Sequence, residues 1–489
     1  MPHVIGIDQS TQGTKVLLFD GSGKILCRVD RPHRQIISEQ GWVSHDMREV
    51  YENLLGGVKE LLEKTGVRDI AAVGLSNQRE TTVCWGEDGM PLAPAIVWQC
   101  SRADELIRRK FPDSRIAQAI QQTTGLPLSP FFPAAKMAWL LENVPDAADN
   151  PGLHLGTVDS YLIYRLTEGT VFATDVSNAS RTQLMDLDTC RWSSHLCSLF
   201  GIPKRALPKI CHSDAEFGET TFGGLLASPV PIRAVMGDSH CALFGHGCVT
   251  PGKMKTTYGT GSSMMLNIGS TPLRSHYGLA TSVAWGWKGQ VSYVLEGNIN
   301  YTGAVISWLK NDLGLISSTS ELEPLIAQAS AADETVLVPA FSGLGAPYWC
   351  NGAKASFAGM GRTTRKPELI KAAVDSIAHQ ICDVFEAMGK DYGKPITQLR
   401  ADGGPTRNEY LMQLQSDLIG QEVIVPSVEE LSAMGAAFMA GISAGVYSED
   451  TVFSQITYRH FSPEMDGSKK KMLRIRWKKA VESVLNQAN

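Results

Sequence analysis

Two segments far apart in the sequence share one layout: an apolar run, a bend of small and hydroxyl residues, and a second apolar run. The first is VIGIDQSTQGTKVLLFD at 4–20, and the second is KMKTTYGTGSSMMLNIG at 253–269. Apolar runs that flank glycine and threonine in this way predict two strands joined as a hairpin. Alternating strand and helix patterns follow each segment, so the layout predicts a duplicated α/β domain with its seam near Gly245.

The size and charge of the chain restrict the classes to which it can belong. Its 489 residues exceed one hydrophobic core and predict two or three domains. The net charge of −5 provides no basic field for nucleic acid or an acidic membrane face. We expect no signal peptide and no membrane-spanning helix. The ten cysteines are scattered singly without C-x-x-C pairs, so we expect reduced thiols and a cytoplasmic protein.

The first bend has the chemistry of a phosphate site. Its small residues let backbone N–H groups converge on an anion, Thr11 and its hydroxyl neighbours add donors, and Lys15 adds positive charge. Asp8, at the end of the first apolar run, is an oxygen ligand suited to Mg²⁺, with water completing the shell. Taken alone, the same residues also fit an ordinary polar turn.

Two further glycine-rich bends strengthen the phosphate interpretation. Gly259 and Gly261 flank Thr260 in the second hairpin, where glycine permits close approach of the backbone to phosphate oxygens. Gly403 and Gly404 lie where a predicted strand meets a helix N-terminus, which favours anions. Each pair alone is explained by turn chemistry, but the three bends together favour a nucleotide cleft. The sequence contains neither the P-loop nor the Rossmann glycine pattern.

Motifs in order along nearly the whole chain resemble the FGGY carbohydrate kinases, and within them most closely the glycerol kinases. FFPAAKMAW and ASFAGMGRTTRKPELIKAAVD are similar to the two family signatures. DQSTQGTK, GLSNQRETTVCW, TDVSNASRT, VPAFSGLGAPYW and DGGPTRNEYLMQLQSD match the pattern elsewhere. The resemblance implies an α/β fold of two actin-like (ribonuclease H-like) ATPase domains flanking a catalytic cleft. We expect the N-terminal domain at 1–245 to hold the substrate pocket, the phosphate hairpin and the catalytic acid, and the C-terminal domain at 246–489 to bind nucleotide.

The resemblance also implies roles for individual residues. Asp238 falls on the catalytic base, and Asp8 falls on the acid associated with magnesium. Polyol contacts fall on Arg79 and Glu80, with Trp98 as a pocket wall. The expected cofactor-binding residues lie on the first bend and in the second half: Thr11, Gln12, Gly13, Lys15, Thr260, Gly303, Ser307, Gly404 and Asn408.

Elementary chemistry supports these roles and leaves an alternative for each. A carboxylate at a strand end, such as Asp238, can accept the proton of an attacking alcohol, but it is equally suited to cap a helix. Arg79 and Glu80 supply a donor fork and an acceptor for neighbouring hydroxyls, or they form a solvated charge pair. Trp98 can pack against a carbon backbone, or it belongs to the core.

Several pocket positions depart from the glycerol kinase pattern. Phe131 stands where a tyrosine is usual, Ser239 replaces a glutamine after the catalytic aspartate, and Ser263 replaces a phenylalanine. Both serines vacate volume, so the substrate pocket is expected to be wider and more polar on one side, with His240 as a further polar group or as packing. In the phosphate bend, Lys15 keeps the charge of the usual arginine but loses its fork.

The expected reaction is ATP- and Mg²⁺-dependent phosphorylation of a primary hydroxyl of a small polyol or sugar, with glycerol as the best single substrate. A kinase for a four- or five-carbon polyol or ketose, such as erythritol, xylulose or ribulose, is the alternative within the family. An actin-like ATPase scaffold without a sugar substrate is the alternative of another class. A homodimer and a homotetramer both stay open as the state of assembly.

Overall fold

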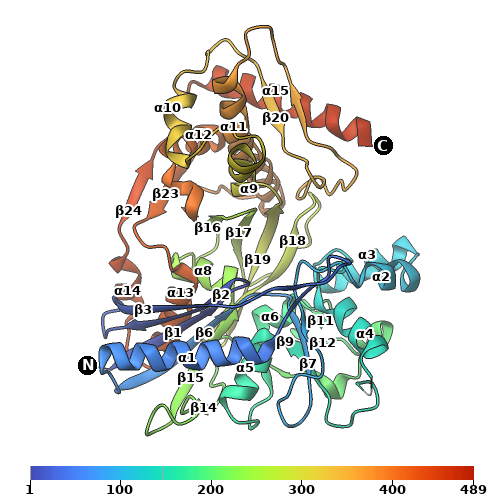
Figure 1. Cartoon of the computed structure of the whole chain (residues 1–489), viewed down its shortest axis with the longest axis vertical. Helices are drawn as coiled ribbons and strands as arrows, with labels where there is room; N and C mark the ends of the chain where they lie inside the picture. Colours follow the sequence, from blue (N-terminus) through green and yellow to red (C-terminus); the bar gives the residue numbers. More distant parts are fainter. Residues whose placement is uncertain (1, 146, 489) are drawn as a thin grey trace.

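The computed structural model describes residues 2–145 and 147–488, which form two lobes built on two mixed sheets (Figure 1). The sheet of the N-terminal half has six strands. In sheet order they are β14 (Glu219–Thr220), β15 (Val230–Gly237), β6 (Ile70–Asn77), β1 (His3–Gln9), β2 (Gly13–Phe19) and β3 (Ile25–Pro32). β1 pairs antiparallel with β2, which confirms the first predicted hairpin, whereas β15, β6 and β1 run parallel.

The sheet of the C-terminal half has seven strands and repeats this plan. In sheet order they are β18 (Ala280–Trp287), β19 (Gln290–Ile299), β17 (Ser262–Gly269), β16 (Met254–Tyr258), β22 (Gln398–Asp402), β23 (Glu422–Pro426) and β24 (Tyr458–Phe461). β16 and β17 pair antiparallel, so the second predicted hairpin is confirmed as well. The duplicated layout in the sequence therefore corresponds to two sheets that each open with a hairpin.

Helices cover both faces of the N-terminal sheet. On one face lie α1 (Met47–Thr65), which ends at the left-handed residue Gly66, and α5 (Val158–Leu166). The other face is covered by α13 (Leu431–Ser443), which comes from the far end of the chain and packs on β1, β6 and β15. Only glycine fits at two of these contacts, because a Cβ on Gly6 or Gly74 would lie 2.6 Å or 2.2 Å from a carbonyl oxygen of α13.

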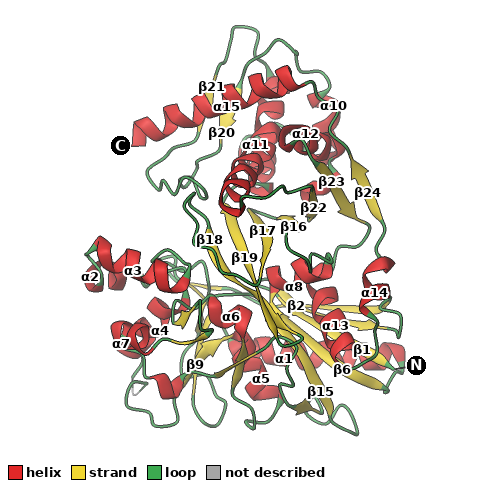
Figure 2. Cartoon of the chain, turned by 180° about the vertical axis from the view of Figure 1, so that it is seen from behind, coloured by secondary structure: helices red, strands yellow, loops and turns green. Residues whose placement is uncertain are grey.

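The two lobes meet at α8 (Asp238–Gly245), which follows β15 and lies between the two sheets (Figure 2). It packs on α13 and contacts β6 and β15 on one side and β16 and β17 on the other. A buried cluster joins side chains from both halves, among them Met236, Phe244, Met265 and Phe438. The two halves therefore pack directly against each other, and α8 lies at the centre of this contact.

The remaining elements complete each lobe. In the C-terminal half, α11 (Lys366–Tyr392) and α12 (Glu409–Ile419) pack together, and α11 also contacts β17 and β19. In the N-terminal half, a second sheet consists of β4 (Ile36–Ile37), β5 (Val43–His45), β8 (Ala95–Ile96), β7 (Thr82–Trp85) and β9 (His154–Thr157). Beside this second sheet lies α4 (Pro133–Asn143), which carries the first family signature. Across residues 2–145 and 147–488, no helix is both long and apolar enough to cross a membrane.

Candidate active site

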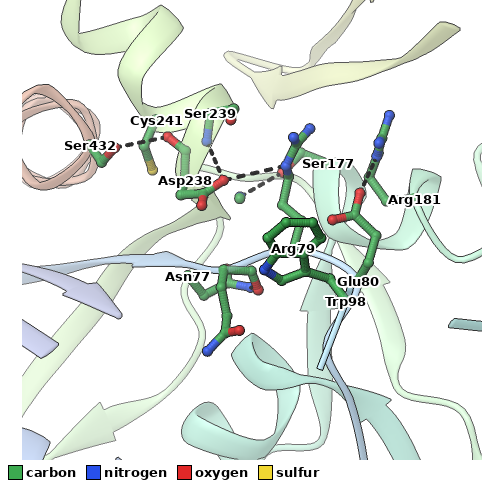
Figure 3. A network of polar contacts seen from close by, with 12 residues as sticks. Asn77, Arg79, Glu80, Trp98, Ser177, Arg181, Asp238, Ser239, Cys241 and Ser432 are labelled. Atoms are coloured by element: carbon green, nitrogen blue, oxygen red, sulfur yellow. Dashed lines mark hydrogen bonds and ion pairs between the residues drawn. The ribbon is translucent and has the colours of Figure 1, made fainter. Parts of the chain in front are cut away.

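Asp238 lies at the carboxyl end of β15, where it begins α8. Gly237 is the N-cap residue of α8, so Asp238 does not occupy the N-cap position but the first position of the helix. The carboxylate accepts the Ser239 N–H at 2.6 Å and lies 3.3 Å from Nε of Arg79 (Figure 3). Its side chain is 34% exposed and lines a pocket of about 430 Å³ together with residues 10–15 and 30–32. The structure therefore brings the predicted base and the predicted phosphate bend to one pocket.

The bend between β1 and β2 is held by short-range hydrogen bonds. The N–H and the hydroxyl of Ser10 both donate to the Gly13 carbonyl, at 2.8 and 2.9 Å. The Trp98 indole donates to the Thr11 hydroxyl at 3.0 Å, so the predicted pocket wall also supports the bend. Gln12 is exposed at its tip. The bend is thus fixed before any ligand arrives.

Two charged groups lie on the strands that lead into the bend. Asp8, on β1, is 6% exposed and accepts a hydrogen bond from the Ser76 hydroxyl at 2.8 Å. Burial raises the pKa of Asp8 to about 6, although the ammonium group of Lys15 opposes the rise. Lys15, on β2, forms an ion pair with Oε2 of Glu430 at 2.8 Å. A carboxylate and an ammonium group therefore approach the bend from adjacent strands.

Arg79 and Glu80 are buried and have different partners, so the alternative of a solvated charge pair is wrong. Arg79 donates from both Nη atoms to Glu296, at 3.0 and 2.8 Å. Glu80, whose backbone is left-handed with φ of 62°, accepts Nε of Arg181 at 2.6 Å. Arg181 also donates to Glu296 at 2.6 Å, which links all four side chains (Figure 3 shows the Glu80 side). Through its contact with Arg79, Asp238 joins this network to the pocket at the phosphate bend.

Two members of this network, Arg181 and Glu296, were not among the residues predicted from the sequence. Both side chains are fully enclosed, at 1% and 0% exposure. Burial opposes ionisation of Glu296, but Arg181 and Arg79 outweigh it and hold the pKa of Glu296 well below its ordinary value. A single carboxylate inside the apolar strand run YVLEGNI is the signal that points to a buried ionic partner.

The three positions that depart from the expected pattern lie around the same network. The Phe131 ring meets Trp98 edge-on, with centroids 5.6 Å apart. Ser263 of β17 lies opposite Asn298 of β19, and Met265 lies opposite Glu296. Because residues two apart on a strand point to the same face, Ser263 faces the same side of the sheet as Glu296. Ser239 contacts Asp238 through its N–H. Within the described residues, the Ser263 hydroxyl has no hydrogen-bond partner.

Two buried basic side chains adjoin this region. His240 is fully buried, and neither ring nitrogen has a partner among the residues that the structure places. Burial and the neighbouring Arg79 lower its pKa well below the ordinary value, so His240 is neutral. Lys136, on α4, donates from Nζ to the Phe131 carbonyl. Burial lowers the pKa of Lys136 to about 7 against the attraction of Glu80.

A second pocket, of about 700 Å³, lies in the C-terminal half. Four predicted nucleotide contacts line it: Gly303, Ser307, Gly404 and Asn408. The exposed Thr260 is joined to this region because its carbonyl accepts the N–H groups of Thr302 and Ala304 at 2.9 and 3.0 Å. Gly303 is required there, since a Cβ would lie 2.7 Å from the Gly259 carbonyl oxygen. Asn408 caps α12 by accepting the Leu411 N–H at 2.7 Å.

Comparison with known proteins agrees with this architecture over the whole chain. The models of the N-terminal and C-terminal domains of the FGGY family of carbohydrate kinases match residues 3–245 and 254–444. Glycerol kinase 1 of Thermotoga maritima is 43% identical over 493 residues, which cover 99% of this chain and 100% of that protein.

Solved structures show the same fold. Glycerol kinase of Plasmodium falciparum with ADP has a TM-score of 0.93 at 33% identity, covering 99% of this chain and 98% of that chain. Xylulose kinase of Lactobacillus acidophilus has a TM-score of 0.90 at 21% identity over the full length of both chains, a likeness of fold. These matches set aside the alternative of an ATPase scaffold without a sugar substrate. The chain belongs to the FGGY family of carbohydrate kinases and is an ATP-dependent carbohydrate kinase.

Proposed function

We propose that this kinase transfers the terminal phosphoryl group of ATP to a primary hydroxyl of glycerol, giving glycerol 3-phosphate and ADP. One observation carries the proposal: Asp238 lines the same pocket as the phosphate bend while its carboxylate contacts the Arg79 network. A relative named as a glycerol kinase at 43% identity supports glycerol as the first substrate to test.

The two halves divide the work in this proposal. Residues 1–245 hold the acceptor alcohol and the transferred phosphate, and residues 246–489 hold the nucleotide. The support for the second part is the 700 Å³ pocket that gathers Gly303, Ser307, Gly404 and Asn408, with Thr260 beside it. The backbone of Gly13 and the side chains of Thr11, Gln12 and Lys15 surround the phosphate in the other pocket.

The proposed metal-associated residue is Asp8. Within 2–145 and 147–488, no group of three or more His, Cys, Asp or Glu side chains is arranged to hold a metal ion. A single buried carboxylate fits Mg²⁺, because this ion keeps several waters and is commonly bound through one carboxylate together with substrate phosphates. Mg²⁺ neutralises the charge of nucleotide phosphates. Asp8→Ala is expected to raise the Mg²⁺ concentration needed for half-maximal rate, and an unchanged metal titration would contradict the assignment.

Asp238 acts as the general base in this proposal. Its carboxylate accepts the proton of the attacking hydroxyl as that oxygen bonds to the terminal phosphorus of ATP, and the bond from that phosphorus to the bridging oxygen breaks to release ADP. Arg79 keeps the base in place through the contact at 3.3 Å. Arg79 is itself held by its ion pair with Glu296 at 2.8 Å.

The acceptor alcohol is proposed to lie among Arg79, Glu80, Trp98 and the three positions that depart from the expected pattern, Phe131, Ser239 and Ser263. Arg79 supplies donors and Glu80 supplies acceptors for adjacent hydroxyls, and the two aromatic rings contact the carbon chain. The network through Arg181 fixes Glu80, so its carboxylate is oriented in advance.

The assembly and place of action are proposals as well. A homodimer or homotetramer is the expected assembly, which light scattering on the purified protein would determine. The cytoplasm is the proposed location, supported by ten cysteines that all lie unbonded in the structure.

The test is a coupled ADP-release assay with glycerol, erythritol, threitol, xylulose, ribulose and dihydroxyacetone. We expect glycerol to give turnover well above the rate with ATP alone. A preference for a four- or five-carbon substrate would assign the enzyme to the alternative within the family, and indifference to every acceptor would refute the proposed reaction.

A further inference from the structure

The first turn of α13 contacts both parts of the catalytic pocket. Glu430 immediately precedes α13 and forms the 2.8 Å ion pair with Lys15 of the phosphate hairpin. Two residues on, the Ser432 hydroxyl donates to the Asp238 carbonyl at 3.1 Å (Figure 3). One turn of a helix from the C-terminal half therefore contacts both the ammonium group of Lys15 and the proposed base Asp238, which belong to the N-terminal half.

Glu430 is anchored independently of Lys15. Its other oxygen, Oε1, lies 2.5 Å from Nη1 of Arg28, and its side chain is only 9% exposed. Arg28 in turn donates from Nε and Nη2 to Asp30, each at 2.8 Å. Asp30 is directly opposite Lys15 in the pairing of β2 with β3, so the side chains of Arg28, Asp30 and Lys15 share one face of the sheet. Glu430 thus offers Lys15 a fixed acceptor.

A lysine at this position needs such an acceptor more than an arginine would. The ammonium group is a point charge on a flexible four-carbon stem, whereas a guanidinium fork is oriented by its own geometry. The Lys15 side chain is 32% exposed, so packing alone does not hold it. The ion pair to Glu430 supplies the missing restraint.

We propose that Glu430 is a positioning residue for phosphoryl transfer, which holds the Lys15 ammonium group at the phosphate bend across the boundary between the two halves. This inference rests on the proposed role of Lys15. Because Glu430 and Lys15 come from different halves, the charge is placed at the bend only when the halves are together. The Lys15 ammonium group is therefore aligned at the bend by the same packing that brings the two halves together.

The experiment measures kcat and KM for glycerol on the full chain at saturating Mg-ATP. The variants are Glu430→Gln, Lys15→Met, the double variant, and Glu449→Gln as a matched control that loses a partly exposed ion pair with Lys288. We expect Glu430→Gln to lower kcat by about tenfold to hundredfold, the range for a misplaced catalytic group, with KM for glycerol within about twofold. The control is expected to match the parent enzyme.

The double variant separates positioning from general damage. If Glu430 acts through Lys15, the kcat of the double variant equals that of Lys15→Met, because the effects of substituting two residues in direct contact are not additive. Losses that multiply, or an unchanged kcat in Glu430→Gln, would overturn the inference. If Glu430→Gln does not fold, Arg28→Gln takes its place, because it removes the anchor of Glu430 and leaves both Glu430 and Lys15 present. We expect Arg28→Gln to lower kcat less than Glu430→Gln would. An unchanged kcat in Arg28→Gln would also overturn the inference. Absence of turnover with any polyol in the parent enzyme would instead refute the proposed function.

Discussion

The buried charge network makes a quantitative prediction for Glu296→Gln. Glu296 accepts three hydrogen bonds, two from Arg79 and one from Arg181, and its side chain has no exposure to solvent. Glutamine has the same shape but one acceptor oxygen, and its NH₂ group must face a guanidinium donor. The substitution therefore removes a buried charge and places an N–H donor of the glutamine against an N–H donor of a guanidinium group.

The size of the effect follows from what remains. Removing one partner of a buried ion pair costs about 3–5 kcal/mol of unfolding free energy. Arg181 keeps Glu80 at 2.6 Å and Arg79 keeps Asp238 at 3.3 Å, so neither guanidinium is left without a counter-ion. We therefore expect the lower end of that range, about 3 kcal/mol. Glu449→Gln, which removes a partly exposed pair, is expected to cost less than about 1 kcal/mol.

The assay is urea unfolding followed by tryptophan fluorescence, with the parent enzyme and Glu449→Gln measured beside Glu296→Gln. Because the pKa of Glu296 lies below its ordinary value of 4.5, its stabilisation is present above that pH and fades as pH falls through the lowered pKa. The difference between parent and variant should then shrink in acid. A loss at pH 7 no larger than that of Glu449→Gln would refute the view that this network stabilises the fold.

Three further predictions concern Asp238, Ser263 and Lys136. Asp238→Asn is expected to lower kcat by about 10²–10⁴-fold while ATP still protects the enzyme thermally, and undiminished turnover would remove Asp238 as the base. Ser263→Phe should narrow the pocket and raise kcat/KM for glycerol relative to erythritol or ribulose, and a shift towards the longer substrates would contradict the volume argument. The pKa of Lys136 in the folded state, about 7, lies below its ordinary value of 10.5. Between these two values the folded state binds fewer protons than the unfolded state, so the unfolding free energy of the parent enzyme increases as the pH rises from 7 towards 10.5. Lys136→Met should lack that gain in urea midpoints at pH 7 and pH 9.5, and parallel profiles would contradict it.

Local chemistry made much of this fold predictable. Turn residues lie next to the strands that they join, so both hairpins and the end of α1 at Gly66 could be placed from the sequence. The positions of the phosphate bend and of Asp238 at a strand end follow from the same local patterns. The family resemblance then supplied roles that no spacing alone provides.

What could not be predicted depends on contacts between the two halves. The partner of Arg79 is 217 residues away, and the partner of Lys15 is 415 residues away. Nothing in the neighbourhood of Glu430 distinguishes a carboxylate that faces the phosphate bend from one that faces solvent. The pair of Lys15 with Glu430 forms only when α13 lies on the first sheet, and local periodicity in the sequence does not reveal that packing.

The return of α13 to the first sheet has a consequence for biosynthesis. All strands of that sheet have emerged by residue 237, but the helix that covers one of its faces begins at Leu431. Until then the apolar side chains of that face, Val4, Leu17 and Ala234 among them, lack the cover that α13 provides. A nascent or truncated N-terminal half is consequently expected to expose this apolar surface and to aggregate, because the helix that covers it is complete only after about nine-tenths of the chain has been translated.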